Sequence, residues 1–274
     1  MIPTTSAFGD FEKAGWEDAA TVSTYDEHLA PVTRQSTAAL LDDAGVRPGL
    51  RVLDVATGAG QAAAAAAGRG AEVAGIDFSG AMLGLARSRH PALRFEQADA
   101  AALPFEAHTF DAVVCAFGLC HFPEPDLALR EAHRVLRHGA RIAFSVWDLP
   151  ERTVGFGAVY AAVRRHGTLE VGLPVGPNFW LYSDPEQSRE ALRDAGFASP
   201  TVRTVPQAWA LADPDQLFQL VLHGTVRAAA LLRAQQPAAR EEIRRLLREV
   251  VTTYRTGDHY ELPMPALLAT AVKA

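Results

Sequence analysis

The chain has 274 residues, of which 49% are hydrophobic and 21% charged, so it can bury a sizeable core in one large domain or at most two. Its formal charge is −6 at pH 7 and no long basic run occurs, which disfavours a nucleic-acid substrate bound through its phosphates. The two cysteines match neither a zinc pattern nor a disulfide framework, and the polar N-terminus is no signal peptide. We therefore expect a cytoplasmic protein with no metal site and no membrane segment.

Strands and helices alternate through the first half of the chain. Residues 1–12 carry little pattern and are expected to be loose or draped over a site. The sequence then predicts helices over 32–44, 61–68, 79–89 and 125–138, and strands that begin at Arg51 and span 72–77, 93–98, 110–117 and 141–147. The last of these helices has Pro125 at its first position and Gly139 past its end. Continuous apolar strands between helices are typical of a parallel sheet that is covered on both faces.

The regular alternation of predicted strands and helices ends at Asp148. A helix near 154–166 precedes a loop rich in glycine and proline, 167–182, which carries three aromatic residues. The sequence then predicts a helix over 185–195, a strand over 200–210, two or three helices within 213–255 and a final strand over 266–273.

A glycine turn follows the first predicted strand and opens the next helix. Gly58, Gly60 and Ala63 fit the pattern G-x-G-x-x-A, and Asp77 ends the second strand, where a carboxylate can accept hydrogen bonds from a ribose diol. The alternative for Asp77 is an acid that stabilises the helix N-terminus ahead of Ser79. The turn by itself fits NAD, FAD and S-adenosylmethionine equally well.

Two later segments of the sequence distinguish between these three candidate ligands. Asp99 ends the third predicted strand, and Phe117 to Pro123 follow the fourth. With these matches at four strand ends, residues 45–150 resemble the class I S-adenosylmethionine-dependent methyltransferases. The similar branch contains small-molecule enzymes such as the ubiquinone/menaquinone biosynthesis methyltransferases. Ala56 and Thr57 depart from this family, which usually has glycine and then cysteine or serine there.

The resemblance implies an α/β fold: a doubly wound, Rossmann-like, seven-stranded sheet with an antiparallel last strand, plus a helical cap. It implies one methyltransferase domain over 1–274. Its parts are a core of about 37–148, 184–211 and 261–274, an N-terminal lid of 1–36, and a cap built from 149–183 and 212–260.

The resemblance also implies the residues that bind S-adenosylmethionine, whose product is S-adenosylhomocysteine. Around the methionine part it places Asp54, Ala56, Gly58 and Gly60, with Tyr25 closing over the carboxylate. Asp77 holds the ribose, and the adenine lies beside Phe78, Met82, Asp99 and Ala100. Phe117 lies where cofactor meets acceptor.

The expected reaction is in-line methyl transfer to a small aromatic or apolar metabolite, with O- or N-methylation favoured over C-methylation. Proximity is its main driving force, and His121 is the candidate general base. An alternative for His121 is a role in shaping its loop. The candidate acceptor-binding residues are His28, Trp147, Phe179, Trp180, Tyr182 and His223.

Two other functions stay open at this point. A protein of this fold can bind the cofactor and catalyse a cyclisation or an elimination. An NAD-dependent oxidoreductase shares the turn and Asp77, but it explains neither Asp99 nor the segment after Phe117. The sequence leaves open whether the protein is a monomer or a homodimer.

Overall fold

The computed structural model describes residues 6–274, which fold into two units. The sheet unit consists of Thr33–Trp147, Gly176–Val205 and Ala266–Ala274. The helical unit consists of the described residues up to Val32, Asp148–Val175 and Pro206–Pro265. The predicted N-terminal lid includes residues 1–5, which lie outside the described residues.

The sheet unit holds a seven-stranded sheet in the order β3-β2-β1-β4-β5-β10-β6. Strands β1 to β5 are parallel, whereas β10 lies antiparallel between β5 and β6. The strands are β1 (Arg51–Val55), β2 (Glu72–Asp77), β3 (Arg94–Gln97), β4 (Phe110–Ala116), β5 (Leu136–Trp147), β6 (Phe197–Val205) and β10 (Ala266–Lys273). The predicted seven-stranded sheet with an antiparallel last strand is therefore confirmed.

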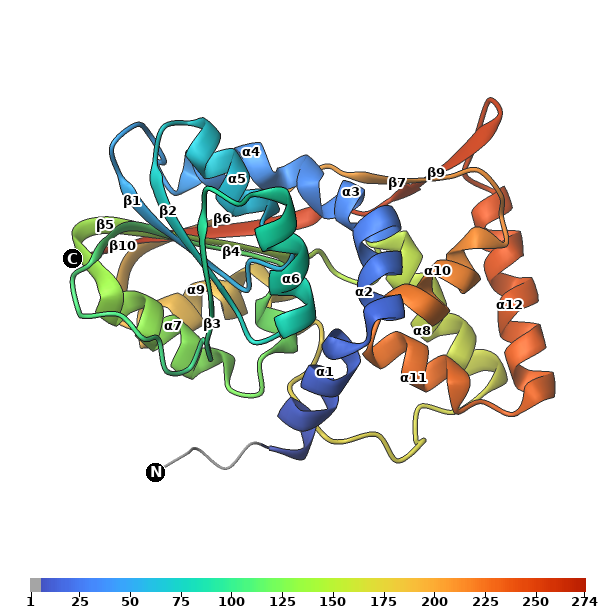
Figure 1. The fold of residues 1–274 in the computed structure, drawn as a ribbon. Coiled ribbons are helices and arrows are strands. Elements are labelled where there is room, and N and C mark those ends of the chain that lie inside the picture. Colours follow the sequence, from blue (N-terminus) through green and yellow to red (C-terminus); the bar gives the residue numbers. More distant parts are fainter. Residues whose placement is uncertain (1–5) are drawn as a thin grey trace. The chain divides into compact units, whose positions relative to one another are not determined.

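Helices cover both faces of this sheet (Figure 1). One face carries α4 (Thr37–Asp43), α5 (Gln61–Gly68) and α6 (Gly80–Arg89), and the other carries α7 (Pro125–Val135) and α9 (Pro185–Asp194). Short 3-10 turns lie at Arg34–Ser36, Leu119–His121 and Leu181–Ser183. Because the strands are buried from both sides, a rigid core holds the residues at the strand ends in place.

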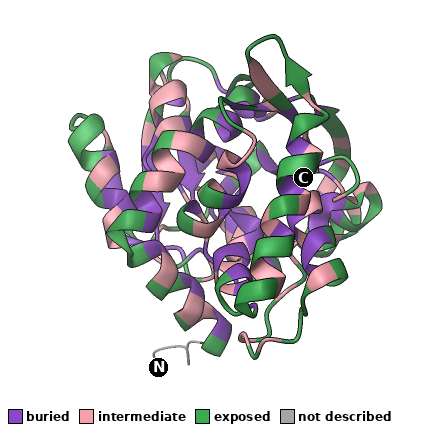
Figure 2. Cartoon of the chain, turned by 90° about the vertical axis from the view of Figure 1, so that its right-hand side faces the viewer, coloured by how far each residue is buried: buried purple, intermediate pink, exposed green. Residues whose placement is uncertain are grey.

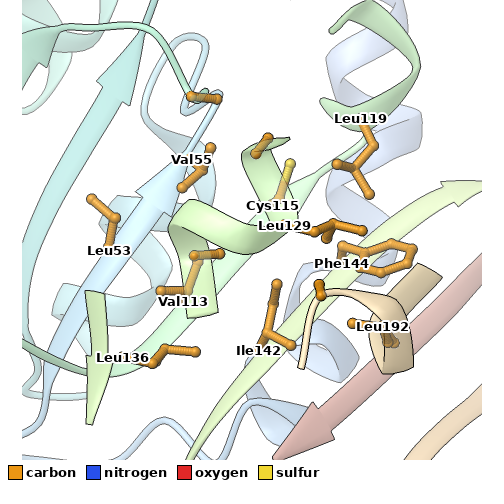
Figure 3. Packing of buried hydrophobic residues seen from close by; sticks show 14 of the residues in the cluster. Leu53, Val55, Val113, Cys115, Leu119, Leu129, Leu136, Ile142, Phe144 and Leu192 are labelled. Atoms are coloured by element: carbon orange, nitrogen blue, oxygen red, sulfur yellow. The ribbon is translucent and has the colours of Figure 1, made fainter. Parts of the chain in front are cut away.

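The core on the α7 and α9 side is apolar throughout. Figure 3 shows Leu53 and Val113 of the sheet packed with Leu129 of α7 and Leu192 of α9. All four side chains are at most 2% exposed. Alternate residues of β1 reach this core, so Asp54, between Leu53 and Val55, points to the opposite face, where α5 lies.

The helical unit combines helices with a three-stranded sheet of order β7-β9-β8. Buried and exposed positions alternate around its helices (Figure 2). The buried stripe of α12, for example, is Ile243, Leu247 and Val251. The elements are α1 (Ala7–Glu17), α2 (Ala19–Thr24), a π-helical turn (Tyr25–Leu29), α3 (Ala30–Thr33), α8 (Val154–His166), β7 (Ala208–Leu211), α10 (Gln216–Gly224), α11 (Arg227–Arg233), α12 (Pro237–Thr252), β8 (Arg255–Thr256) and β9 (His259–Pro263). Among residues 6–274, no helix has the length and apolar character that crossing a membrane requires.

Some predicted elements differ from those observed. Residues 7–12 are not loose but begin α1, because the Ser6 hydroxyl caps the helix and Phe8 is buried. The helix predicted over 125–138 ends at Val135, and Gly139 adopts a φ of +77° inside β5. The sequence also missed β8 and β9, and the strand predicted over 200–210 is divided into β6 and β7.

Candidate cofactor site

The glycine turn after β1 is a run of left-handed backbone. Ala56, Gly58 and Gly60 have φ values of +56°, +54° and +82°. The Thr57 N–H donates to the carbonyl of Ile76 in β2 at 2.8 Å, and the Gly60 N–H donates back to the Thr57 carbonyl at 2.9 Å. The turn is thus fixed to the neighbouring strand before any ligand contacts it.

Two features of the structure require glycine at position 60: its left-handed backbone conformation and the side chains packed against it. A Cβ atom at this position would lie 2.8 Å from Cζ of Phe95 and 3.1 Å from Cδ2 of His90. We expect Gly60→Ala to lower the free energy of unfolding by about 2–4 kcal/mol, from left-handed strain and overpacking together. Denaturant titration measures this loss.

Gly84→Ala is the matched control for that substitution. Gly84 lies inside α6, and a Cβ there has no atom within 4 Å. Alanine should stabilise this helix by about 0.5–1 kcal/mol. Equal stability of the Gly60 and Gly84 variants would contradict the assigned role of Gly60.

Asp54 anchors the start of α5 to β1. It is fully buried, and its Oδ2 accepts from the Thr57 hydroxyl at 2.7 Å and from the Ala63 N–H at 2.9 Å. Burial raises the pKa of Asp54 to about 7, against the opposing effect of these two hydrogen bonds. The nearby carboxyl of Asp77 raises it further.

Asp77 joins the turn to the helix that follows β2. It is 7% exposed; its Oδ2 accepts from the Gly58 N–H at 2.8 Å and its Oδ1 from the Ser79 N–H at 2.9 Å. Burial raises its pKa, while the two N–H groups and the charge of His121 lower it. Since each carboxylate oxygen has about two lone-pair sites, Asp77 can still accept from a ligand. The Ser79 hydroxyl caps α6 through the Met82 N–H.

The predicted adenine residues lie near the ends of β2 and β3. Met82 and Ala100 are buried, whereas Asp99 is exposed and accepts from the Ala101 N–H through Oδ1 at 2.8 Å. The Phe78 carbonyl accepts from the Gln97 side chain at 2.8 Å. The backbone N–H of Ala98 donates to the Asp77 carbonyl and brings the two strand ends together.

Two aromatic rings lie at the carboxyl ends of β4 and β5. Phe117 and Trp147 are 4% and 6% exposed, and their ring centroids are 4.3 Å apart. Phe117 has a φ of +56°, and its N–H donates to the carbonyl of Ser145 at 3.0 Å. His121 ends the 3-10 turn that follows, and its N–H donates to the Gly118 carbonyl at 2.9 Å.

The other predicted acceptor-binding residues lie on different elements and make different contacts. Tyr182 is buried and donates its hydroxyl to Asp126 at 2.9 Å. Phe179 and Trp180 make an edge-to-face pair with ring centroids 4.9 Å apart. His28 and His223 belong to the helical unit, on the π-helical turn and on α10. These assignments stay predictions.

Tyr25 opens the π-helical turn of the helical unit, and its ring packs edge-on against Trp16 at 5.1 Å. Its predicted closing over the cofactor likewise stays a prediction.

Within the sheet unit, Asp54, Asp77 and Phe117 lie at the carboxyl ends of adjacent parallel strands, β1, β2 and β4. This edge is where ligands bind in open α/β sheets. A buried oxygen of Asp54 without a hydrogen-bond partner among the described residues shows that the site can accept one more donor. These residues therefore fit a ligand that presents hydrogen-bond donors, such as hydroxyl or ammonium groups, to carboxylates.

Residues 53–144 match a family model described as a methyltransferase domain. The chain is 36% identical to a demethylmenaquinone methyltransferase of Deinococcus radiodurans over 163 residues, which cover 54% of this chain and 67% of the relative. The chain belongs to the class I S-adenosylmethionine-dependent methyltransferases. Its cofactor is S-adenosylmethionine.

Other proteins that are similar to this chain are methyltransferases too. This chain is 44% identical to the ubiquinone/menaquinone biosynthesis C-methyltransferase UbiE of Rhizobium etli, over 38% of this chain and 45% of the relative. The chain spans about half to two thirds of the length of such curated relatives. A phosphoethanolamine N-methyltransferase 2 of Haemonchus contortus in complex with S-adenosyl-L-methionine shares the fold, with a TM-score of 0.58 and 19% identity over 97% of this chain and 60% of that one.

The sequence interpretation did not single out Gln61, the first residue of α5, whose buried Nε2 has no hydrogen-bond partner among the described residues. It directly follows Gly60, and that position is the only sequence signal that could have drawn attention to it.

Proposed function

We propose that this methyltransferase methylates an oxygen or nitrogen atom of a small aromatic or apolar metabolite. When bound, S-adenosylmethionine supplies a methyl group that its sulfonium charge has already activated. The chain then has to hold the cofactor, align the acceptor and exclude water. We assign Asp77 to the ribose hydroxyls, the turn at Gly58 to the methionine part, and Met82 and Ala100 to the adenine.

The observation that carries the proposed acceptor class is the aromatic pair of Phe117 and Trp147. Both rings are buried at the carboxyl ends of adjacent strands, β4 and β5. An apolar wall of this kind excludes water and favours a flat ring through stacking. The names of the relatives, which point to quinone rings, support an aromatic acceptor as well.

We assign His121 as the general base that takes a proton from the acceptor. It follows β4 within five residues, and its charge acts on Asp77. His121→Ala should lower kcat by roughly 10²-fold, the lower range for a general base, and should leave cofactor affinity almost unchanged. Steady-state rates as a function of pH, together with calorimetric cofactor binding, measure both quantities.

His259→Ala is the control for His121, because His259 lies in the helical unit, where it pairs with Asp258 and Glu261. A general base also gives the pH–rate profile a limb that disappears in His121→Ala. An unchanged rate and profile would leave proximity as the sole mechanism.

Methyl transfer itself is tested with S-adenosylmethionine labelled at its methyl group and a panel of phenols, heteroaromatic amines and quinones. Label should enter the acceptor, and NMR of the product identifies whether oxygen, nitrogen or carbon carries it. Cofactor binding without any label transfer, with the acceptor rearranged, would favour a cyclisation or an elimination instead.

A further inference from the structure

A pocket of about 440 Å³ lies in the sheet unit, away from the candidate cofactor site. Its lining comes from residues 44–50, which connect α4 to β1, from Asp111 near the start of β4, and from residues 137–141 near the start of β5. The pocket therefore lies at the amino ends of the parallel strands, whereas the cofactor residues lie at their carboxyl ends. Its volume is within the range of pockets that hold small molecules.

A bulge at the start of β5 forms one wall of this pocket. The two β4 residues that flank Asp111 pair with Leu136 and Arg141 of β5. Four residues of β5, 137–140, therefore face Asp111 alone and form the bulge. The arginine that begins the bulge and the arginine that follows it, Arg137 and Arg141, both line the pocket.

The lining carries more positive than negative charge. Among residues 6–274 it holds three arginines, Arg47, Arg137 and Arg141, and one carboxylate, Asp111. Asp111 accepts from the Arg137 guanidinium through Oδ1 at 2.7 Å and from the Arg51 N–H through Oδ2 at 2.9 Å. Partial burial raises the pKa of Asp111, but these two hydrogen bonds and the charge of Arg137 lower it overall. Asp111 thus stays ionised and holds the Arg137 side chain in place.

The other two arginines keep their charge for a ligand. Within the described part of the chain, neither Arg47 nor Arg141 forms an ion pair. The nearby carboxylate of Asp43 pairs with Arg203 at 2.9 Å, and it is the Asp43 carbonyl that accepts from Arg141, at 3.4 Å. A Cβ atom at Gly45 would lie 3.9 Å from Cδ of Arg141, so the connection to β1 packs along the stem of this arginine. The pocket is left with an excess of two positive charges.

These charges and this volume identify the kind of ligand. A guanidinium is a planar fork of donors that matches the oxygens of phosphate or carboxylate groups, and two excess charges match a phosphate dianion. The pocket is larger than one phosphate ion, so it leaves room for a small organic group. We propose that it is a second binding site, in which Arg47, Arg137 and Arg141 hold the phosphate group of a small organic phosphate.

The test uses calorimetry at pH 8 and constant ionic strength, with ribose 5-phosphate and inorganic phosphate as probes. Both should bind, and the ester should bind at least as tightly as the free ion. Arg141→Met should weaken both at least tenfold, because a charge-assisted bidentate contact is lost. Arg141→Lys, which keeps the charge but not the fork, should give an intermediate loss.

Two further variants separate binding from folding. Arg47→Met changes an exposed residue of the connection between α4 and β1, and it should also weaken both probes at least tenfold while the unfolding curve stays unchanged. Arg130→Met is the matched control, because Arg130 is exposed on α7 and does not line the pocket. Its affinity for both probes should equal that of the unsubstituted protein.

A competition experiment separates this pocket from the cofactor site. Saturation with S-adenosylhomocysteine should leave the affinity for ribose 5-phosphate unchanged, since the two sites lie at opposite ends of the strands. Displacement of the probe by S-adenosylhomocysteine, or unchanged affinity in both Arg47→Met and Arg141→Met, would overturn the inference. Tighter binding of inorganic phosphate than of the ester would assign the pocket to the free ion, and tighter binding of citrate than of either would assign it to carboxylates; each result would contradict an organic phosphate.

Discussion

Replacing Arg227 with methionine is expected to lower the free energy of unfolding by about 3–5 kcal/mol. Arg227 pairs with Glu12 across 2.8 Å in the helical unit, where the Glu12 side chain is buried, with 1% exposed, and the Arg227 side chain is partly buried, with 15% exposed. The Trp16 indole donates to the other carboxylate oxygen at 3.1 Å. Methionine keeps much of the arginine's apolar volume but leaves the charge of Glu12 buried without its cation.

Denaturant unfolding of three variants tests this expectation. Arg245→Met is the control, because Arg245 pairs with Glu242 and Glu249 on the exposed face of α12 and should cost at most about 1 kcal/mol. Adding Glu12→Gln to Arg227→Met should recover part of the loss, since the buried charge is then gone. Equal losses in Arg227→Met and Arg245→Met would show that the buried pair contributes no more than an exposed one.

Replacing Asp77 with alanine is expected to weaken cofactor binding by about 1–3 kcal/mol, a five- to 150-fold rise in Kd. Two effects add: the ligand loses an acceptor, and the N–H groups of Gly58 and Ser79 lose the carboxylate that holds them. The turn is then free to leave the geometry that the cofactor requires.

Calorimetric titration with S-adenosylhomocysteine measures the effect of Asp77→Ala. Asp111→Ala is the control, because Asp111 also accepts from a backbone N–H, that of Arg51, but lies at the opposite end of the strands. Unchanged affinity in Asp77→Ala, with the control also unchanged, would contradict both effects: the contact of Asp77 with the cofactor and the dependence of the site on the hydrogen bonds that Asp77 accepts.

Much of the sheet unit could be predicted because its signals are local. The pattern of apolar strands and capped helices gave β2, α5 and β10 with their observed bounds, and the position of Asp77 at a strand end follows from it. The end of α7 could not be predicted in this way. Leu136 continues the apolar pattern of the helix, but it pairs with Phe110 as the first residue of β5.

Only the glycine turn and the acids at the strand ends of the candidate site could be predicted from the sequence. Glycines and acids at strand ends are visible in the sequence, whereas the significance of Gln61 depends on an atom that folding buries without a partner. The hairpin of β8 and β9 is short and mostly polar, so no periodicity marks it. The ion pair of Glu12 and Arg227 joins residues 215 positions apart, which local patterns cannot reveal.

The antiparallel position of β10 also has a consequence for the order in which the chain can fold during its synthesis. Among residues 6–274, β6 is an edge strand that pairs with β10, and β10 pairs with β5 on its other side. The five parallel strands can assemble once Trp147 has left the ribosome, but β5 then ends the sheet with an unpaired edge. Only after residues 266–273 emerge can that edge be covered, so the nascent chain carries an aggregation-prone strand edge for almost half of its translation.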